Sequence, residues 1–122
     1  MNTIAQIFVG LAGAFHLAVF VMESLLFTKP STYRRFLVPN ETEAAIARPW
    51  AFNQGFYNLF LALGALGGLI AGGDKGHAIA LFACACMAGA GLVLVASNRK
   101  MVRSAVLQAG PPIIALVLAA VL

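Results

Sequence analysis

The sequence predicts an all-α membrane protein, a four-transmembrane-helix bundle with up-and-down topology and both termini outside. Hydrophobic residues make up 61% of the 122 residues and charged residues only 10%, against roughly 25% charged residues in a soluble domain. The hydrophobic residues form four runs, and about 20 apolar residues are enough to cross a bilayer as a helix. Most of the Lys and Arg residues lie in the links between these runs. These observations exclude a soluble globular protein and a disordered chain.

The four predicted spans form a single membrane domain, 1–122. They cover residues 4–27, 50–71, 77–96 and 102–122. The links 72–76 and 97–101 are so short that the helices on either side of each must be antiparallel neighbours. The first run has no basic segment before it and is longer than the apolar part of a signal peptide, so we interpret it as a retained span.

The distribution of cations predicts the orientation of the bundle. Seven of the eight Lys and Arg residues lie in or directly beside the connections on one side. They are Lys29, Arg34, Arg35, Arg48, Arg99, Lys100 and Arg103. Only Lys75 lies on the other side, so the positive-inside rule places the seven in the cytoplasm and both termini outside. We therefore expect a multi-pass protein of the cell inner membrane, in contact with membrane lipids and with no nucleic-acid partner.

The connection between the first two spans is the only long one. Its segment 33–38 mixes aromatic and aliphatic residues with two arginines, which favours a position on the anionic headgroups. Asn40 followed by Glu43 has the form of a helix N-cap, so a helix is expected to begin near Glu41 and to continue into the second span. Pro49 should kink or interrupt this helix, because proline lacks the amide hydrogen that the helix needs.

Small residues at every fourth position predict faces where helices approach closely. Gly64, Gly68 and Gly72 form such a face in the second span, and Ala85 and Gly89 repeat the spacing in the third. Packing inside the bundle is the first interpretation, because a four-helix core needs surfaces of this kind. A homodimer through Gly64, Gly68 and Gly72 is the alternative.

Cys84 and Cys86 have no predicted metal or redox role. Residues two apart on a helix point about 200° apart and cannot hold one ion between them. In apolar surroundings a thiol behaves as a small hydrophobe. The sequence also contains no phosphate-binding loop, nucleotide fingerprint or nucleophile elbow. We therefore expect no metal and no cofactor.

Two ionisable residues, His16 and Glu23, lie inside the first predicted span. An ionisable group inside a span is costly and is therefore a functional candidate. Seven residues of α-helix correspond to about 700° of rotation and about 10 Å of rise, so both side chains should lie on one face without touching. We assign His16 and Glu23 as a catalytic acid and base. A metal ion held by both is disfavoured, since about 10 Å is too far for one ion.

Other predicted spans place polar residues at a similar depth, and these are the candidate ligand-binding residues. They are Asn53, Gln54, Tyr57, Asn58, Arg103 and Gln108. Residues four apart share a helix face, so a polar pocket in the cytoplasmic half of the bundle is expected, with His16 at its floor. The alternative is that these residues only join helices by hydrogen bonds, with Glu23 paired to Arg103. The sequence leaves both interpretations open.

Three groups of residues resemble those of a known family. They are His16, Glu23 and the run 26–30 (LFTKP); the run 53–58 (NQGFYN); and the run 108–111 (QAGP). Together they span almost the whole chain and resemble the small bacterial membrane proteins grouped as domain-of-unknown-function family 1304. The resemblance implies that their polar residues are characteristic positions of the family: His16, Glu23, Asn53, Gln54, Tyr57, Asn58 and Gln108. It implies no reaction.

The chain departs from the pattern of that family at three places. Ser24 stands where Met is usual, residues 48–50 (RPW) replace a milder approach to the second span, and Ala109 separates Gln108 from Gly110. Ser24 and Ala109 bear on packing around a pocket. Residues 48–50 bear on how the chain enters the second helix.

Three functions are compatible with these residues. In the first, Glu23 and His16 act as acid and base on a small hydrophobic or lipid-like molecule in the pocket, as in an isomerisation or epimerisation. The second is a proton-coupled exporter, since four helices with a carboxylate in the first span resemble the small multidrug resistance transporters. The seven-to-one distribution of cations argues against dual insertion. The third is a structural or accessory membrane subunit whose polar residues only join helices. Whether the chain is an enzyme stays open.

Overall fold

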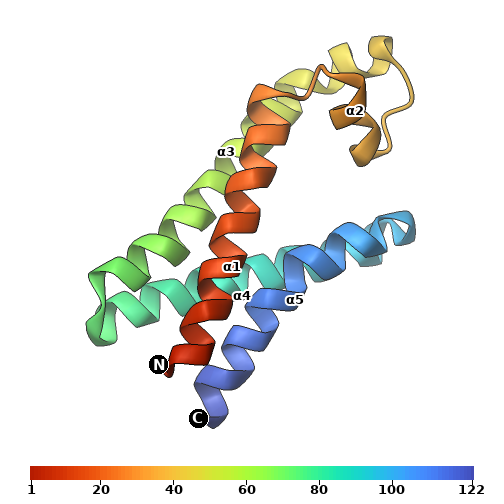
Figure 1. Cartoon of the computed structure of the whole chain (residues 1–122). Coiled ribbons are helices and arrows are strands. Elements are labelled where there is room, and N and C mark those ends of the chain that lie inside the picture. Colours follow the sequence, from red (N-terminus) through yellow and green to blue (C-terminus); the bar gives the residue numbers. More distant parts are fainter. The chain divides into compact units, whose positions relative to one another are not determined.

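A computed structural model describes all 122 residues of the chain. It is all-α, with 89% of the residues helical and no strand. The elements in chain order are α1 (Thr3–Phe20), the π-helical turn η1 (Val21–Leu25), α2 (Pro30–Tyr33), the 3-10 turn η2 (Arg34–Phe36), α3 (Glu41–Ala71), α4 (Gly73–Ser97), the 3-10 turn η3 (Arg99–Met101) and α5 (Val102–Val121) (Figure 1). Four helical segments are long and apolar enough to cross a membrane: Thr3–Leu25, Glu41–Ala71, Gly73–Ser97 and Arg99–Val121. The predicted all-α class with four spans is confirmed, and the chain is a multi-pass membrane protein.

The helix α3 begins earlier than the predicted second span. It begins at Glu41 and continues through Pro49 without a break. The start follows from Asn40, whose Oδ1 accepts a hydrogen bond from the Glu43 N–H at 2.9 Å and caps the helix as predicted. Pro49 does not interrupt α3, because the cost is one helix hydrogen bond at a site where Ala45, the residue four positions earlier, is exposed and its carbonyl can be solvated.

The turn between α3 and α4 is shorter than the five-residue link that the sequence predicts. α4 begins at Gly73, directly after Gly72, and these two glycines have positive φ angles of 64° and 66°. Residues with a Cβ atom rarely adopt this left-handed conformation, so the two glycines make the abrupt reversal of the chain possible.

The chain forms two compact units. The first unit consists of residues 1–16 and 61–122, and the second unit of residues 17–60. α1 and α3 therefore contribute residues to both units. Each unit has a hydrophobic core of its own.

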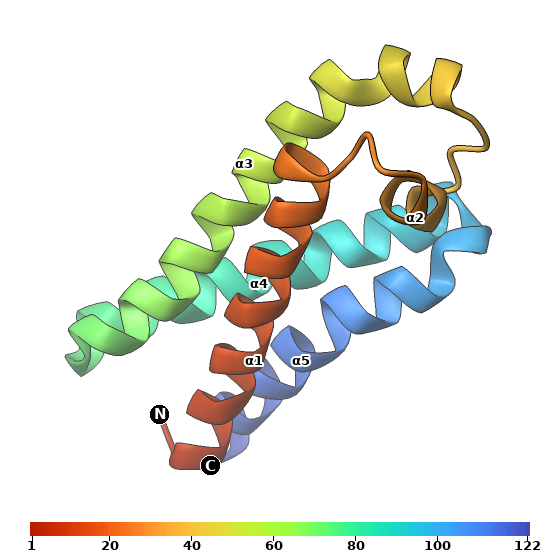
Figure 2. The ribbon, with the colours of Figure 1, turned by 45° about the horizontal axis from the view of Figure 1, so that its top comes forward.

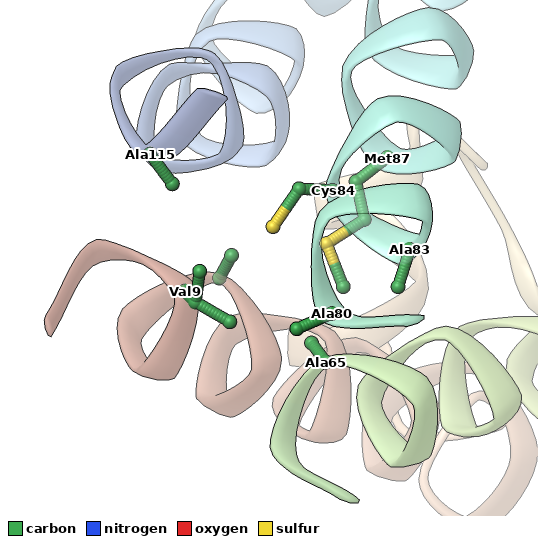
Figure 3. Packing of buried hydrophobic residues seen from close by; sticks show 8 residues of the cluster. Val9, Ala65, Ala80, Ala83, Cys84, Met87 and Ala115 are labelled. Atoms are coloured by element: carbon green, nitrogen blue, oxygen red, sulfur yellow. The ribbon is translucent and has the colours of Figure 1, made fainter. Parts of the chain in front are cut away.

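The core of the first unit consists mainly of alanines. Its buried members come from α1, α3, α4 and α5 (Figure 3): Val9, Ala12, Ala65, Ala80, Ala83, Cys84, Met87 and Ala115. Such small side chains let helix backbones approach closely, as is common in membrane proteins. At Gly68 of α3, an added Cβ would lie 2.5 Å from the carbonyl oxygen of Gly76 and 2.7 Å from the backbone nitrogen of Ala80. α3 and α4 therefore meet through their backbones.

The small-residue face predicted for the second span packs inside the chain. Gly64 and Gly68 face α4, since a Cβ at Gly64 would lie 3.2 Å from an alanine Cβ of α4, whereas Gly72 lies in the turn. The homodimer through these glycines stays a prediction. The face predicted for the third span is wrong, because Ala85 and Gly89 are exposed. Each of them follows a buried residue directly and therefore lies about 100° further round α4.

α4 and α5 form a helical hairpin within the first unit. Gly91 makes the close contact possible, since a Cβ there would lie 2.7 Å from the Cβ of Ala109. The two ends of the chain also meet in this unit (Figure 2), where Asn2 Nδ2 donates a hydrogen bond to the Leu118 carbonyl at 3.0 Å. Both termini therefore lie at the same end of the first unit.

The core of the second unit joins the long connection to the beginning of α3. Its buried members are Phe27, Tyr33, Ala44 and Ala51, with Phe36, Val38 and Ala47 packed against them. Tyr33 of segment 33–38 is only 3% exposed, because α3 offers it an apolar surface to pack against. The position of the segment on the headgroups stays a prediction. Leu37 and the two arginines of the segment remain exposed.

Candidate functional site

A π-helical turn at the end of the first span carries the carboxylate that the sequence singles out. The turn covers Val21–Leu25 and is closed by a hydrogen bond from the Leu26 N–H to the Val21 carbonyl at 3.0 Å. Glu23 in this turn is half-buried, and Ser24 is buried. Such turns are rare and occur often at functional sites. The turn brings two adjacent polar side chains against α3.

Ser24 anchors the turn on α3. Its Oγ donates a hydrogen bond to the carbonyl of Phe52 at 2.8 Å. Gly55 makes this contact possible, because an added Cβ there would overlap the Ser24 Oγ and lie 3.0 Å from the Ser24 Cβ. The sequence analysis gave Gly55 no role and connected Ser24 only with packing, although two signals pointed to them. Ser24 departs from the resembled family, and Gly55 lies inside its most specific run.

Asn58 holds the Glu23 carboxylate. Its Nδ2 donates to Glu23 Oε1 at 2.6 Å and to the backbone carbonyl of Gln54 at 3.2 Å. Both partners are acceptors, so the hydrogen bonds fix which end of the Asn58 carboxamide is the nitrogen. Asn58 is only 7% exposed. The pair of Glu23 and Asn58, which we call the carboxylate–amide pair, is thus positioned by α3 and the π-helical turn.

The carboxylate–amide pair leaves two oxygen atoms free. Glu23 Oε2 and Asn58 Oδ1 accept no hydrogen bond from another side chain or from the backbone. Neither is completely buried, since His16 Nε2 is the one fully buried side-chain nitrogen or oxygen without a partner. The pair therefore presents two unpaired acceptors that are not completely buried.

Phenylalanines surround this part of the second unit. Phe56 of α3 packs edge to face against Phe20 of α1, with ring centroids 5.2 Å apart. Phe52 and Phe60, one turn before and after Phe56, have ring centroids 5.1 Å and 6.4 Å from it. Phe52 and Phe60 are 44% and 59% exposed. α3 therefore offers an exposed aromatic surface on the side of Phe52, Phe56 and Phe60, whereas Asn58, two residues from Phe56 and Phe60, projects from a different side of the helix.

The other polar residues predicted on the second span do not join the carboxylate–amide pair through their side chains. Asn53, Gln54 and Tyr57 are exposed, and Gln54 contributes only its backbone carbonyl. Asn53 and Tyr57 lie four residues apart and share a helix face, as predicted. Their role as ligand-binding residues stays a prediction.

The two polar residues predicted on the last span lie in the first unit. Arg103 is exposed in the first turn of α5. Gln108 donates from Nε2 to the carbonyl of Met87 at 3.3 Å and so joins α5 to α4. This hydrogen bond is the helix-joining role that the sequence left open as the alternative.

His16 lies in the first unit and is completely buried. Its Nδ1 is 2.8 Å from the carbonyl of Ala12, one turn earlier in the same helix. A carbonyl only accepts, so Nδ1 carries the hydrogen, and in the neutral ring Nε2 carries the lone pair. Nε2 has no hydrogen-bond partner. The ring of Phe15 packs edge to face on the imidazole, with centroids 5.6 Å apart.

Possible metal ligands are scattered over the chain. No group of three or more His, Cys, Asp or Glu residues is placed to hold a metal ion. Cys84 lies in the core of the first unit and Cys86 is half-buried, and both are free thiols.

Comparison with known proteins identifies the family. The model of the family described as "Protein of unknown function (DUF1304)" matches residues 10–120, which include every polar residue discussed above except those at the N-terminus. No curated protein and no solved structure matches the chain. Because the match covers nearly the whole chain, the protein belongs to the DUF1304 family.

Proposed function

We propose that this protein binds a small hydrophobic or lipid-like molecule whose polar group contacts the carboxylate–amide pair. The observation that carries the proposal is the free Oε2 of Glu23, held inside a membrane span by a single amide donor. An ionisable residue inside a membrane span is costly and usually pairs with another group or marks a functional site. A ligand that contacts Glu23 Oε2 would explain why the chain has a carboxylate in a span despite this energetic cost.

A purely structural role explains the carboxylate less well. Helices in membranes are often joined by Asn and Gln side chains, which form the same hydrogen bonds without a titratable group. Gln108 in the first unit is a case of this kind. At position 23 a glutamine could accept the same hydrogen bond from Asn58 at lower cost. Glu23 therefore supports a function that needs a carboxylate.

Extraction of bound molecules tests the proposal. The full chain, E23Q and E41Q are purified in mild detergent, and their organic extracts are compared by mass spectrometry. Glu41 is exposed in the first turn of α3, so E41Q removes one negative charge away from the pair. We expect a molecule enriched with the wild type and E41Q and depleted with E23Q. Identical extracts from three folded proteins would contradict the proposal.

An acid–base role extends the proposal from binding to chemistry. A carboxylate with one free oxygen can take a proton from a bound molecule or return one to it. In the second unit, the free carboxylate oxygen is Glu23 Oε2. In the first unit, the buried His16 Nε2 has a free lone pair. Incubation of the extracted molecule in D2O should introduce deuterium at carbon in the presence of the protein and not in its absence. No such exchange would restrict the function to binding.

A proton-coupled exporter is the second candidate, and the same observation favours it. In such a protein, Glu23 would exchange a proton for a substrate on each transport cycle. Efflux of ethidium from cells that express the wild type or E23Q distinguishes the candidates. Faster efflux with the wild type than with E23Q supports export, and equal efflux supports binding without transport.

For the orientation we propose the cell inner membrane, with both termini outside. The seven-to-one distribution of Lys and Arg between the two sides supports it. A C-terminal alkaline phosphatase fusion, which is active only outside the cytoplasm, should be active, and a C-terminal green fluorescent protein fusion should be dark. The opposite pair of results would reverse the orientation.

A further inference from the structure

We infer that the molecule bound by the carboxylate–amide pair carries a protonated primary or secondary amine on an apolar body. This inference rests on the proposed function and names the chemical class of its ligand. It follows from counting the hydrogen-bond donors and acceptors that the pair and its neighbour Ser24 still have free.

The donors around the pair are all in use. Asn58 has two N–H groups on its side chain, and they serve two acceptors, Glu23 Oε1 and the Gln54 carbonyl. Ser24 has one O–H group, and it donates to the Phe52 carbonyl. With Glu23 ionised, the pair and the serine beside it therefore have no hydrogen left to donate to a ligand.

The free atoms of the pair are acceptors. Glu23 Oε2 and Asn58 Oδ1 are unpaired and not completely buried. A ligand carboxylate or phosphate would bring a third set of acceptors against them and would be repelled. Only a group that donates at least two hydrogen bonds satisfies both oxygens.

The charge of the carboxylate selects an ammonium group over a hydroxyl group. A hydroxyl group donates one hydrogen bond and leaves the negative charge unbalanced, whereas an ammonium group donates two or three and neutralises it. The basic residues of the second unit are all exposed: Lys29, Arg34, Arg35 and Arg48. Glu23 lies in a membrane span, so the body that carries the ammonium group is apolar.

Four probes with the same twelve-carbon chain test this inference. They are dodecylamine, dodecyltrimethylammonium, dodecanol and dodecanoate. The full chain is placed in phosphatidylcholine nanodiscs, and the thermal unfolding midpoint is measured against the concentration of each probe, because a bound ligand stabilises the folded state. We expect dodecylamine to raise the midpoint at a concentration at least about tenfold lower than the other three probes.

The variants E23Q and E41Q sharpen the result. In E23Q the new side chain can still accept from Asn58, but the free acceptor becomes an N–H donor. We therefore expect E23Q to lose the preference for dodecylamine and to gain a response to dodecanoate, while E41Q behaves as the wild type. If E23Q fails to fold, the ranking of the four probes on the wild type still decides the question.

Three rankings overturn the inference. An equal response to dodecyltrimethylammonium would show that charge without a donor suffices, and an equal response to dodecanol would show that charge is not needed. A preference for dodecanoate would reverse the class. Each of these leaves the proposed binding function standing if the molecule enriched in the extracts still depends on Glu23. Probe responses independent of Glu23, together with identical extracts, would overturn both.

Discussion

The two units of the chain join their helices in different ways. In the first unit the helices meet through small residues, so that at Gly68 the backbones of α3 and α4 are almost in contact. In the second unit the turn η1 meets α3 through the Ser24 hydroxyl placed over Gly55, and Phe20 at the end of α1 packs edge to face on Phe56 of α3. The Gly68 contact uses apolar and backbone atoms, whereas the Gly55 contact includes a hydrogen-bonded side chain.

This difference indicates where a ligand can bind. The core of the first unit is formed by apolar side chains, and the one buried polar atom without a partner there is His16 Nε2. The second unit holds a carboxylate with one unpaired oxygen that is not completely buried. We therefore expect substitutions in the first unit to act mainly on stability, and substitutions at the carboxylate–amide pair to act on binding as well.

The largest effect is expected for Gly68→Ala. The new Cβ would approach two backbone atoms of α4, which cannot move aside without separating the helices. The free energy of unfolding, measured by SDS titration in mixed micelles, should fall by about 3 kcal/mol. Gly67→Ala is the matched control, because nothing lies within 4 Å of a Cβ there, and it should stabilise by about 0.5 to 1 kcal/mol. Equal effects of the two would contradict the backbone contact.

A smaller loss is expected for Gly55→Ala in the second unit. Here the overlap is with the Ser24 Oγ, the end of a side chain that can rotate away once its hydrogen bond to Phe52 breaks. The free energy of unfolding should fall by about 2 kcal/mol. Ser24→Ala alone should cost about 1 kcal/mol. Because Ser24→Ala removes the overlapping atom, the double variant should cost less than the sum of the two. If the two losses of unfolding free energy simply add in the double variant, Ser24 does not contact Gly55.

Asn58→Leu should cost about 1 to 2 kcal/mol, because it removes the only hydrogen bond that the structure gives to Glu23. The same substitution at Asn53, which is exposed and has no side-chain hydrogen bond, should change the free energy of unfolding by less than about 0.5 kcal/mol. Asn58→Leu should also remove Glu23-dependent enrichment of the bound molecule. Retention of that molecule by a folded Asn58→Leu protein would exclude Asn58 from the site.

The smallest effect is expected for Gln108→Leu. Its hydrogen bond to the Met87 carbonyl is 3.3 Å long, and hydrogen bonds between membrane helices contribute about 0.6 kcal/mol on average. The free energy of unfolding should fall by about that amount, and the extract should equal that of the wild type. A loss of the bound molecule in this variant would show that the first unit takes part in binding.

The sequence predicted the parts of the fold that depend on composition and local hydrogen bonding. Four spans follow from the lengths of the apolar runs, and the beginning of α3 follows from the cap at Asn40. The packed face of α4 could not be derived in the same way. Small residues occur all round α4, so a four-residue spacing fits the exposed Ala85 and Gly89 as well as the buried residues directly before them.

The candidate site was predicted in part. Glu23 was predicted to be functional because a carboxylate in a span is costly. Asn58 was predicted as a ligand-binding residue because it belongs to a polar pattern on the second span. The prediction that His16 and Glu23 share a face assumed an unbroken α-helix, but the π-helical turn that begins at Val21 changes the rotation per residue. No local residue pattern predicts such a π-helical turn. Inside the turn, Ser24 lies against Gly55, which is far away in the sequence.

The central claim is that the free oxygen of Glu23 contacts a bound molecule. An experimental structure of the full chain in a lipid nanodisc, at a resolution that shows side chains, tests it most directly. We predict density that does not belong to the chain in hydrogen-bond contact with Glu23 Oε2, while Asn58 Nδ2 keeps its bond to Oε1. A Glu23 carboxylate with both oxygens bonded to side chains of the protein, and no further density beside it, would contradict the claim.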